Sequence, residues 1–525
     1  MNSWKLRIAG VLVLLTTIWY VPWLFTRLNL DALWLSIPFA AASVMTAIMG
    51  LITIINHWTV SNPELHPLPD GAAHDVAVII PTYGEPAEMV HKTAQSVLEQ
   101  DYPTDRLHLI VSDDGHRLAI REVVAQLRQT YPQAEIVYFE PPLRGDPARR
   151  GEAKAGNLNA AFDFIKSWDQ QPAFVETRDA DDLVGDPSFL RHAVGQLVLD
   201  SKLGFVQTIK EAHVSEGDPF GNLEPLFYRR AMLTKNSANA VFPCGSGLVW
   251  RREALEDIEG FPTWNLVEDL QSGVEALRRG WRGAYLPVVG AVGQTAPEDI
   301  PNAVKQRGTW AIDTMRLTFW GDKSGLSVQQ HIQFAELGFF YMLSFAVLVF
   351  AITPIFSLIF DIYPIITTQT EYALHFWPFA LSVELLLIAL ADGLPFETLW
   401  RTRQTWLGMA PVYLKAMLVA LFYGPNRKPT YRVTRKEHVY RWYWREILPQ
   451  LVLFLALIGA IIYHVLTEPV LYTADLGSLF WAALFAVGLS RMIRNSWHGL
   501  ELVERPIFGW WRGLRRSQQE EQPRL

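Results

Sequence analysis

The sequence predicts an α/β domain with a mostly parallel, Rossmann-like sheet, inserted between membrane-spanning α-helices. Half of the 525 residues are hydrophobic and only 19% are charged, against about 25% in an ordinary soluble domain. Long apolar runs lie towards both ends of the chain, and short β-rich runs alternate with helical stretches between them. This alternation is typical of a parallel sheet.

Two apolar runs open the chain, from Ile8 to Phe25 and from Ala32 to Ile55. A bilayer crossing takes about 20 apolar residues, so each run is long enough to span. We therefore expect two transmembrane helices within residues 1–58.

Residues 59–335 predict a single α/β domain. Strands are expected at Val76–Ile80, His108–Ser112, Glu135–Tyr138, Phe174–Thr177 and Phe205–Thr208, and helices at Glu88–Gln100 and Leu118–Thr130. Acidic residues outnumber basic ones by 43 to 29 before Asp392, whereas basic residues prevail by 17 to 10 from there on. The acidic part fits a soluble domain and the basic part fits a membrane surface.

Four further apolar runs predict two spans within residues 336–392 and two within 446–494. They are Leu337–Phe360, Phe376–Ala391, Ile447–Leu466 and Leu476–Ile493. The run that contains Glu384 is the weakest, because it is short and charged. Between the pairs, residues 393–445 are expected to hold a helix in the membrane interface, from Trp400 to Phe422, followed by a basic segment. Residues 495–525 form a tail.

The distribution of Lys and Arg predicts how the chain is oriented across the membrane. The segments Asp361–Ala373 and His464–Ala474 contain no Lys or Arg, whereas the stretch between them contains ten. The positive-inside rule then predicts that the α/β domain and both termini of this multi-pass protein face the cytoplasm. We expect the membrane to be a bacterial plasma membrane. The net charge of −7 argues against a nucleic-acid partner.

Acidic clusters follow two of the predicted strands. Asp113 and Asp114 end one strand, and Asp179 and Asp181 follow another. Carboxyl ends of parallel strands meet at one edge of a sheet, where ligands bind. Asp-Asp-Gly by itself favours a turn, but two clusters placed after strands favour a site in which Asp179 and Asp181 hold Mg²⁺ or Mn²⁺ against a diphosphate.

Two later motifs have a structural and a functional interpretation. Glu268-Asp269 fits either a helix N-terminus or an acid–base site. Gln306-Arg307-Gly308-Thr309-Trp310 fits either a juxtamembrane belt or a sugar-binding platform. The lone cysteine, Cys244, excludes an intrachain disulfide and a cysteine-based metal cluster, and we expect it to pack as a small apolar residue.

Taken together, the motifs resemble the membrane-embedded family-two glycosyltransferases, most closely the cellulose synthase-like branch. The resemblance rests on the order Asp113-Asp114-Gly115, Lys154-Ala-Gly-Asn-Leu-Asn159, Asp179-x-Asp181, Phe242-Pro-Cys244-Gly245-Ser246, Glu268-Asp269 and Gln306-Arg307-x-x-Trp310. Tyr431-x-Val433-Thr434-x-Lys436 resembles the gating loop of cellulose synthases.

This resemblance implies a GT-A-type domain that transfers a sugar from UDP with inversion. It implies that Asp269, beside Glu268, is the catalytic base, and that Asp179 and Asp181 hold the metal. The donor would lie against Asp113, Asp114, Lys154, Asp179, Gln306 and Arg307, the acceptor against Trp310, Cys244 and Gly245, and the gate at Tyr431, Val433, Thr434 and Lys436.

Two positions depart from the family pattern. Val267 replaces a Thr before Glu268-Asp269, and Thr309 replaces an Arg before Trp310. The second change removes a bidentate donor expected at the diphosphate. Lys305, Arg307 and Arg316 are the nearby basic residues that could compensate.

The leading hypothesis is a metal-dependent enzyme that polymerises a sugar from UDP-glucose into a β-linked, cellulose-like glucan and passes it through its own helices. One alternative is transfer of one or a few sugars to a membrane lipid. Another is a non-catalytic transporter, which leaves the joint presence of Glu268, Asp269 and Trp310 unexplained. Accessory export proteins and a homo-oligomer remain open as further partners.

Overall fold

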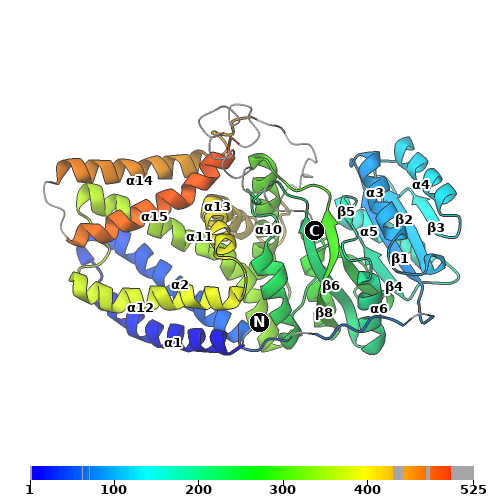
Figure 1. Ribbon diagram of the computed structural model, residues 1–525, viewed down its shortest axis with the longest axis horizontal. Helices are drawn as coiled ribbons and strands as arrows, with labels where there is room; N and C mark the ends of the chain where they lie inside the picture. The colour runs from blue at the N-terminus through cyan, green and yellow to red at the C-terminus, as the bar shows by residue number, and fades with distance from the viewer. Residues whose placement is uncertain are drawn as a thin grey trace, which may run out of the picture.

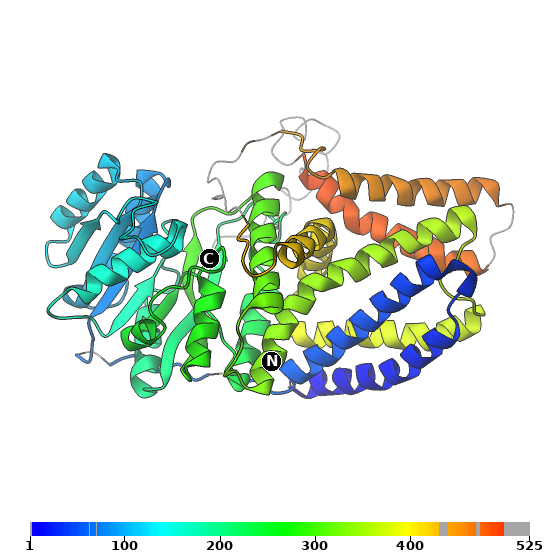
Figure 2. The ribbon, with the colours of Figure 1, turned by 180° about the vertical axis from the view of Figure 1, so that it is seen from behind.

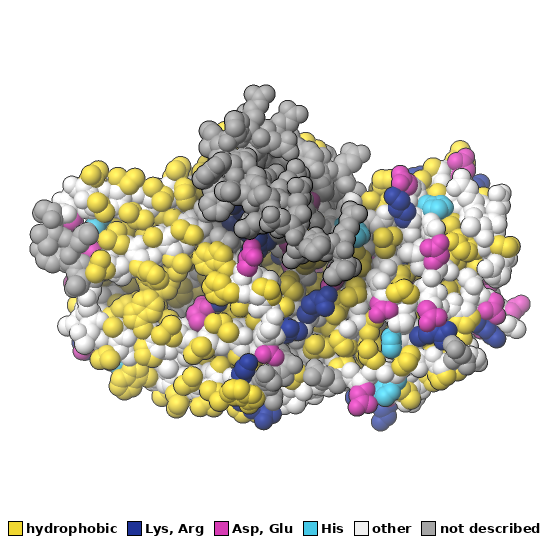
Figure 3. Space-filling model, in the orientation of Figure 1, with side chains coloured by type: hydrophobic (Ala, Val, Ile, Leu, Met, Phe, Trp, Pro, Cys, Tyr) yellow, Lys and Arg dark blue, Asp and Glu magenta, His cyan; other side chains and the backbone are white. Residues whose placement is uncertain are grey.

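The computed structural model describes residues 3–61, 63–69, 71–429, 439, 441–468 and 473–497. It consists of a helical bundle at one end and an α/β domain at the other (Figures 1 and 2). Hydrophobic side chains spread over the surface of the bundle, whereas charged side chains gather on the α/β domain (Figure 3). This division agrees with a membrane part and an aqueous part.

Seven of the described helices are long and apolar enough to cross a membrane. They are α1 (Ser3–Thr26), α2 (Leu33–His57), α11 (Val328–Phe360), α12 (Gln369–Ala391), α13 (Phe396–Tyr423), α14 (Leu448–Thr467) and α15 (Thr473–Asn495). A short helix, η1 (Leu30–Ala32), precedes α2. Six of the seven long apolar helices coincide with the predicted spans. The remaining one, α13, coincides with the helix predicted for the membrane interface.

Helix α13 lies between the bundle and the α/β domain. Figure 1 shows it nearly end-on, whereas α12 and α14 run across the view. It packs against α10 (Ile300–Trp320), α11 and α15, and its Arg403 pairs with Glu384 of α12. Length and composition thus admit α13 as a span, while its direction suits an interfacial helix.

The ends of the bundle remote from the α/β domain contact one another. Asn29 donates a hydrogen bond to the carbonyl of Tyr363 at 2.9 Å, and the Tyr363 hydroxyl lies 3.2 Å from Asp475. The segments after α1 and after α11 and the start of α15 therefore share one side. The opposite ends of these helices point towards the α/β domain.

The α/β domain is built on an eight-stranded sheet in the order β3-β2-β1-β4-β7-β6-β8-β5. The strands are β1 (Val76–Thr82), β2 (Leu107–Asp113), β3 (Glu135–Phe139), β4 (Phe174–Thr177), β5 (Asp182–Leu183), β6 (Leu203–Ala212), β7 (Leu248–Arg251) and β8 (Arg282–Gly293). All five predicted strands are present; β5, β7 and β8 were not predicted. The pairs around β7 and the β5–β8 pair are antiparallel, so the sheet is mixed, with its parallel part at β3-β2-β1-β4 and β6-β8.

Strand β1 is fully buried because helices cover both faces of the sheet. Val76, Val78 and Ile80 face a core shared with α3 (Ala87–Leu98), α4 (Leu118–Thr130) and α6 (Phe189–Leu199). Ala77 and Ile79 face a second core with α5 (Ala153–Lys166) and α9 (Asp269–Arg278). A strand covered on both faces needs apolar residues at every position, which explains its unbroken apolar sequence.

The remaining helices are short and lie mostly near the site. They are η2 (Thr104–Arg106), the π-helical turn η3 (Phe227–Ala231), α7 (Met232–Thr234), η4 (Lys235–Ala238) and α8 (Arg252–Asp257). A π-helical turn often marks a functional region, and residues of η3 line the cavity described next.

Candidate active site

A cavity of about 1010 Å³ lies at the carboxyl ends of the central strands. It extends from Tyr83, Asp114, Asp179 and Asp269 in the α/β domain to residues of α2, α11, α12 and α13. Ligand pockets commonly measure about 300–1,000 Å³. This cavity therefore lies at the upper end of that range, and both the α/β domain and the bundle contribute to its wall.

Lys154, at the beginning of α5, joins three of the predicted motifs. Its ammonium nitrogen lies 2.6 Å from a carboxylate oxygen of Asp179, 3.2 Å from Glu268 and 3.2 Å from the carbonyl oxygen of Gly245. Burial by itself lowers the pKa of Lys154, but the carboxylates of Asp179 and Glu268 raise it well above its usual value. Lys154 therefore carries a permanent positive charge at the centre of the cavity.

A second lysine, Lys210 of β6, completes this charged cluster. Its ammonium nitrogen lies 2.7 Å from Asp179 and 2.8 Å from the buried Asp182. The two lysines hold the pKa of Asp179 far below its usual range, against the effect of burial. No motif in the sequence points to Lys210, because only the pairing of β4 with β7 and of β7 with β6 brings the end of β6 near the turn after β4.

Asp269 is the first residue of α9 and lines the cavity. Its carboxylate accepts a hydrogen bond from the backbone of Leu270 at 2.7 Å. Burial, followed by the neighbouring charge of Glu268, raises the pKa of Asp269 to about 6. A carboxylate with a pKa near the working pH is suited to accept a proton.

Asp313 of α10 fixes the loop that carries Glu268 and Asp269. Its two carboxylate oxygens accept hydrogen bonds from the backbone nitrogens of Leu266, at 2.9 Å, and Val267, at 2.7 Å. The side chain of Asn265 in turn donates to the backbone carbonyl of Asp313 at 3.0 Å. Asp313 was not predicted, since nothing in its local sequence reveals a partner 46 residues away.

Asp114 and Asp113 have different surroundings. Asp114 lines the cavity and pairs with Arg149 at 2.5 Å and Arg144 at 3.0 Å. The Arg144 guanidinium lies 4.0 Å from the ring centre of Tyr83. Asp113 is fully buried, and its carboxylate accepts hydrogen bonds from the backbone nitrogen and the side chain of Arg117. Of these two predicted donor residues, only Asp114 is among the described residues that line the cavity.

Comparisons with known proteins agree with this geometry. Residues 73–312 match the family model described as "Glycosyltransferase like family 2". The chain carries a family-two glycosyltransferase domain. It is 31% identical over 379 residues to a UDP-forming cellulose synthase catalytic subunit from Pseudomonas fluorescens, covering 67% of this chain and 47% of that protein. It is 29% identical over 367 residues to putative cellulose synthase 2 from Komagataeibacter xylinus, and this match covers 66% of this chain and 22% of that protein.

The chain spans less than half the length of these two cellulose synthase relatives. A solved structure with a similar fold is a mannosyltransferase from Pyrobaculum calidifontis in complex with GDP-Man and Mn²⁺. The TM-score is 0.50 at 21% identity, and the match covers 73% of this chain and 99% of that one. This likeness supports a GT-A-like fold.

The glycosyltransferase domain offers few metal ligands of its own. Asp179 and Asp181 line the cavity, but no group of three or more His, Cys, Asp or Glu side chains within the described ranges is arranged to hold a metal. Mg²⁺ commonly takes one or two carboxylates and completes its shell with water and substrate phosphates. The residues thus fit a divalent cation that arrives with a diphosphate.

Cys244 and Gly245 form part of the cavity wall. The backbone nitrogen of Cys244 donates to the Gln207 side chain at 2.7 Å, and burial raises the pKa of its thiol. Gly245 has a φ of +85°. A Cβ there would lie 3.2 Å from the Lys154 nitrogen and 3.3 Å from an Asp269 oxygen, so glycine leaves the space between Asp269 and Lys154 open.

Gln306, Thr309 and Trp310 of α10 all line the cavity, and so does Arg307. The guanidinium of Arg307, however, lies 2.6 Å from Glu224 and donates to the carbonyl of Gly221 at 2.7 Å. The structure thus places Arg307 as a support of the loop at residues 215–224, hereafter the cavity loop, rather than as a group directed at a phosphate.

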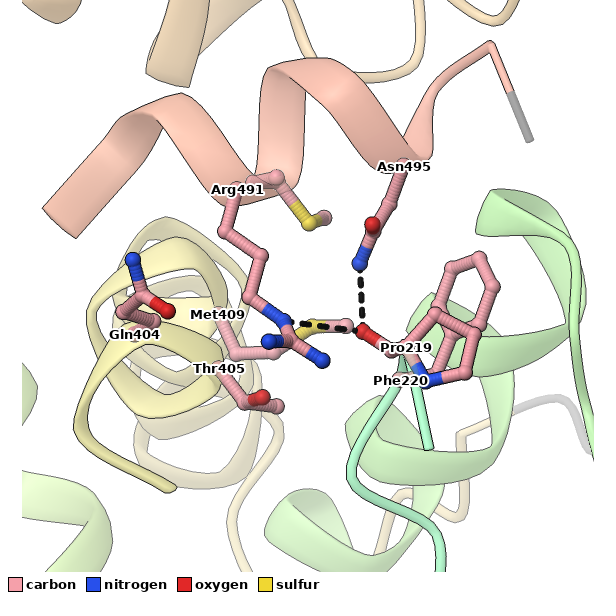
Figure 4. A pocket seen from close by; sticks show the side chains of 8 residues that line it. Pro219, Phe220, Gln404, Thr405, Met409, Arg491 and Asn495 are labelled. Carbon is pink, nitrogen blue, oxygen red and sulfur yellow. Dashed lines mark hydrogen bonds between the residues drawn. The ribbon is translucent and has the colours of Figure 1, made fainter. Parts of the chain in front are cut away.

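Two helices of the bundle region hold the same loop. Arg491 of α15 donates to the carbonyl of Asp218 at 2.9 Å. Arg491, at 3.2 Å, and Asn495, at 2.5 Å, both donate to the carbonyl of Pro219 (Figure 4). Arg401 of α13 donates to the carbonyl of Gly217. The wall of the cavity is therefore fixed by α10, α13 and α15 together.

The predicted gating residues Tyr431, Val433, Thr434 and Lys436 lie outside the described residues. The segment before them is described, and it contacts the loop that precedes α9. The indole nitrogen of Trp264 donates to the carbonyl of Pro425 at 3.1 Å, and Lys428 donates to the carbonyl of Thr263 at 2.9 Å.

Proposed function

We propose that this glycosyltransferase transfers a hexosyl group from a UDP-sugar, with glucose as the leading candidate, to a hydroxyl of an acceptor, with inversion at the anomeric carbon. The observation that carries the proposal is the meeting of Asp269, Lys154 and Asp179 in one buried cavity. Asp269 takes the proton of the acceptor hydroxyl as its oxygen attacks the anomeric carbon. The bond from that carbon to the diphosphate oxygen breaks, and UDP leaves with the bonding electrons.

The donor occupies the side of the cavity formed by the ends of β1 and β2. Tyr83, Asp114 and Arg144 lie there. The ring of Tyr83 offers a flat surface to uridine, and Asp114 and Arg144 offer polar contacts. Lys154 places its charge towards the diphosphate. A bound Mg²⁺ or Mn²⁺, held by Asp179 and Asp181, supplies further positive charge for the departing diphosphate.

The acceptor occupies the side lined by Trp310, Cys244 and Gly245. The apolar face of a sugar ring stacks on an indole while its hydroxyl groups remain free to reach polar partners. Glu268 keeps Lys154 in place and raises the pKa of Asp269. Closure of the segment that contains Tyr431, Val433, Thr434 and Lys436 would exclude water, so that the sugar is transferred rather than hydrolysed.

The leading candidate product is a β-linked, cellulose-like polysaccharide passed through the bundle. The cellulose synthases among the relatives support this choice, and so does the continuity of the cavity from Asp269 to α2, α11 and α12. The domain would then face the cytoplasm of a bacterial cell. An accessory export protein or a homo-oligomer remains a prediction.

A second candidate, glycolipid synthesis, is favoured by the lining of the cavity within the bundle. This part is lined largely by apolar side chains: Met49, Leu337, Leu343, Val383, Leu386, Leu387 and Leu390. Sugar hydroxyls buried without hydrogen-bond partners cost free energy, whereas an acyl or prenyl chain requires none. An acceptor lipid would place its head group at Asp269 and its tail between α2, α11 and α12.

Incubation of the purified protein in lipid nanodiscs with radiolabelled UDP-glucose separates these candidates. Polymer synthesis gives label in long, ethanol-insoluble product, and lipid synthesis gives label that chloroform and methanol extract. Trp310→Ala should shorten or abolish the polymer in the first case. Wild-type protein that neither binds UDP nor releases it from any of a panel of UDP-hexoses would overturn the proposed function.

A further inference from the structure

We propose that Lys210 is a donor-site residue that contacts the diphosphate of the UDP-sugar and supplies the positive charge absent at Thr309. The inference rests on the proposed function for the identity of the donor. It adds a residue that lies outside every motif identified in the sequence.

The position of Lys210 is the first support. Its ammonium nitrogen lies within 2.8 Å of both Asp179 and Asp182 and its side chain is one-quarter exposed. Asp179 bonds to Lys154 through one carboxylate oxygen and to Lys210 through the other. The two lysines therefore stand on either side of the carboxylate that the diphosphate approaches.

The three basic residues near Thr309 do not supply the missing charge. Arg307 is held by Glu224 and by carbonyls of the cavity loop. Arg316 is fully buried, and its guanidinium reaches Asn265 and the carbonyls of Gly424 and Arg427. Neither Arg316 nor Lys305 is among the described residues that line the cavity.

The other basic side chains of the cavity wall bind elsewhere. Arg144 pairs with Asp114, and Arg401 binds Glu397 and the carbonyl of Gly217. Lys235 lies 3.1 Å from Gln333 and 3.9 Å from Glu336, at the membrane side. Of the described lysines and arginines that line the cavity, only Lys154 and Lys210 contact the Asp179 carboxylate.

The charge balance of the cavity requires such a group. Five carboxylates surround the two lysines: Asp179, Asp181, Asp182, Glu268 and Asp269. A diphosphate brings further negative charge into this buried space, where uncompensated charge is costly. A lysine has a flexible stem and three donors, so Lys210 can keep its contact with Asp179 while it donates to a phosphate oxygen.

In the transfer step, the leaving oxygen of the β-phosphate gains the electron pair of the broken bond to the anomeric carbon. Lys210 neutralises part of that charge and remains protonated throughout. The proton of the acceptor hydroxyl goes to Asp269, so no further reactant is required.

The test compares the affinities of UDP and uridine, measured by calorimetry with Mg²⁺ present, for the full-length protein and its variants. Lys210→Met should weaken UDP binding about 10- to 100-fold, the loss expected for a charge-assisted hydrogen bond, and leave uridine binding unchanged. Lys210→Arg should restore most of the UDP affinity. Lys202→Met is the matched control, because Lys202 is an exposed lysine just before β6, and it should change neither affinity.

Equal weakening of UDP and uridine in Lys210→Met would make Lys210 a structural residue and overturn the inference. Unchanged UDP affinity in a folded Lys210→Met protein would overturn it as well, while leaving the proposed function intact. Wild-type protein that binds no UDP would instead overturn the proposed function, and the role of Lys210 with it.

Discussion

The ammonium nitrogen of Lys154 lies 2.6 Å from a carboxylate oxygen of Asp179. This contact joins the start of α5 to the turn after β4, two segments that the sequence separates by 25 residues. Because Lys154 also lies 3.2 Å from Glu268, one cation connects the turn after β4 with the residue that precedes Asp269.

Asp269→Asn should separate binding from chemistry. The amide keeps the shape of the side chain but cannot accept a proton, so turnover should fall by about 10²- to 10⁴-fold while UDP binding persists. Calorimetry with UDP and a UDP-release assay measure the two properties. Loss of UDP affinity along with turnover would make Asp269 a donor-site or structural residue.

The pH profile should report the raised pKa of Asp269. Because the base acts in its ionised form, kcat/KM should fall as the pH drops through about 6 and level off above it. Glu268→Gln removes the negative neighbour that raises this pKa, so the midpoint should move to lower pH. A midpoint that stays in place in Glu268→Gln would assign the titration to another group.

Asp181→Asn should impair metal-dependent transfer. The substitution removes one anionic ligand of a cation that the diphosphate shares, so activity should be lost or should require much higher Mg²⁺ or Mn²⁺ concentrations. EDTA should abolish the activity of the wild type, and added metal should restore it. Full activity of a folded Asp181→Asn protein in EDTA would contradict the metal assignment.

Asp313 should act as a positioning residue for the base. Asp313→Asn keeps one of the two acceptors for the backbone of Leu266 and Val267, and Asp313→Ala keeps neither. Turnover should therefore fall in a graded way, by about 10-fold or more, because small displacements of a catalytic group are costly. UDP affinity serves as the control and should stay the same; its loss would indicate a wider structural defect.

Reporter fusions should test the topology. Fusions after Gly321 and after Arg494 should report the cytoplasm, and a fusion at Thr368 the outside, because the segments after α1 and after α11 and the start of α15 lie together away from the α/β domain. An external signal at Arg494 would mean that α13 crosses the membrane or that another helix does not.

Local sequence patterns determined much of the fold and the outline of the site. The apolar run Val76–Ile80 predicts the strand β1, and Phe174–Thr177 and Leu118–Thr130 match β4 and α4 residue for residue. Asp179-x-Asp181 follows β4, Asp269 begins α9, and these three side chains line the cavity. Burial of apolar runs and the side-chain chemistry of short motifs act over a few residues, so the sequence reveals them.

The tertiary structure decided what depends on distant partners. Asp113 and Asp114 are neighbours in sequence. Asp113 is buried and bonded to Arg117, whereas Asp114 lines the cavity. Lys210 and Asp313 became site residues only because sheet pairing and the packing of α10 bring them to Asp179 and to the loop that precedes α9. Arg307 supports the cavity loop because Glu224 lies beside it. Hydrogen bonds, ion pairs and desolvation depend on distances of a few ångströms between segments far apart in the chain, and only the folded arrangement sets those distances.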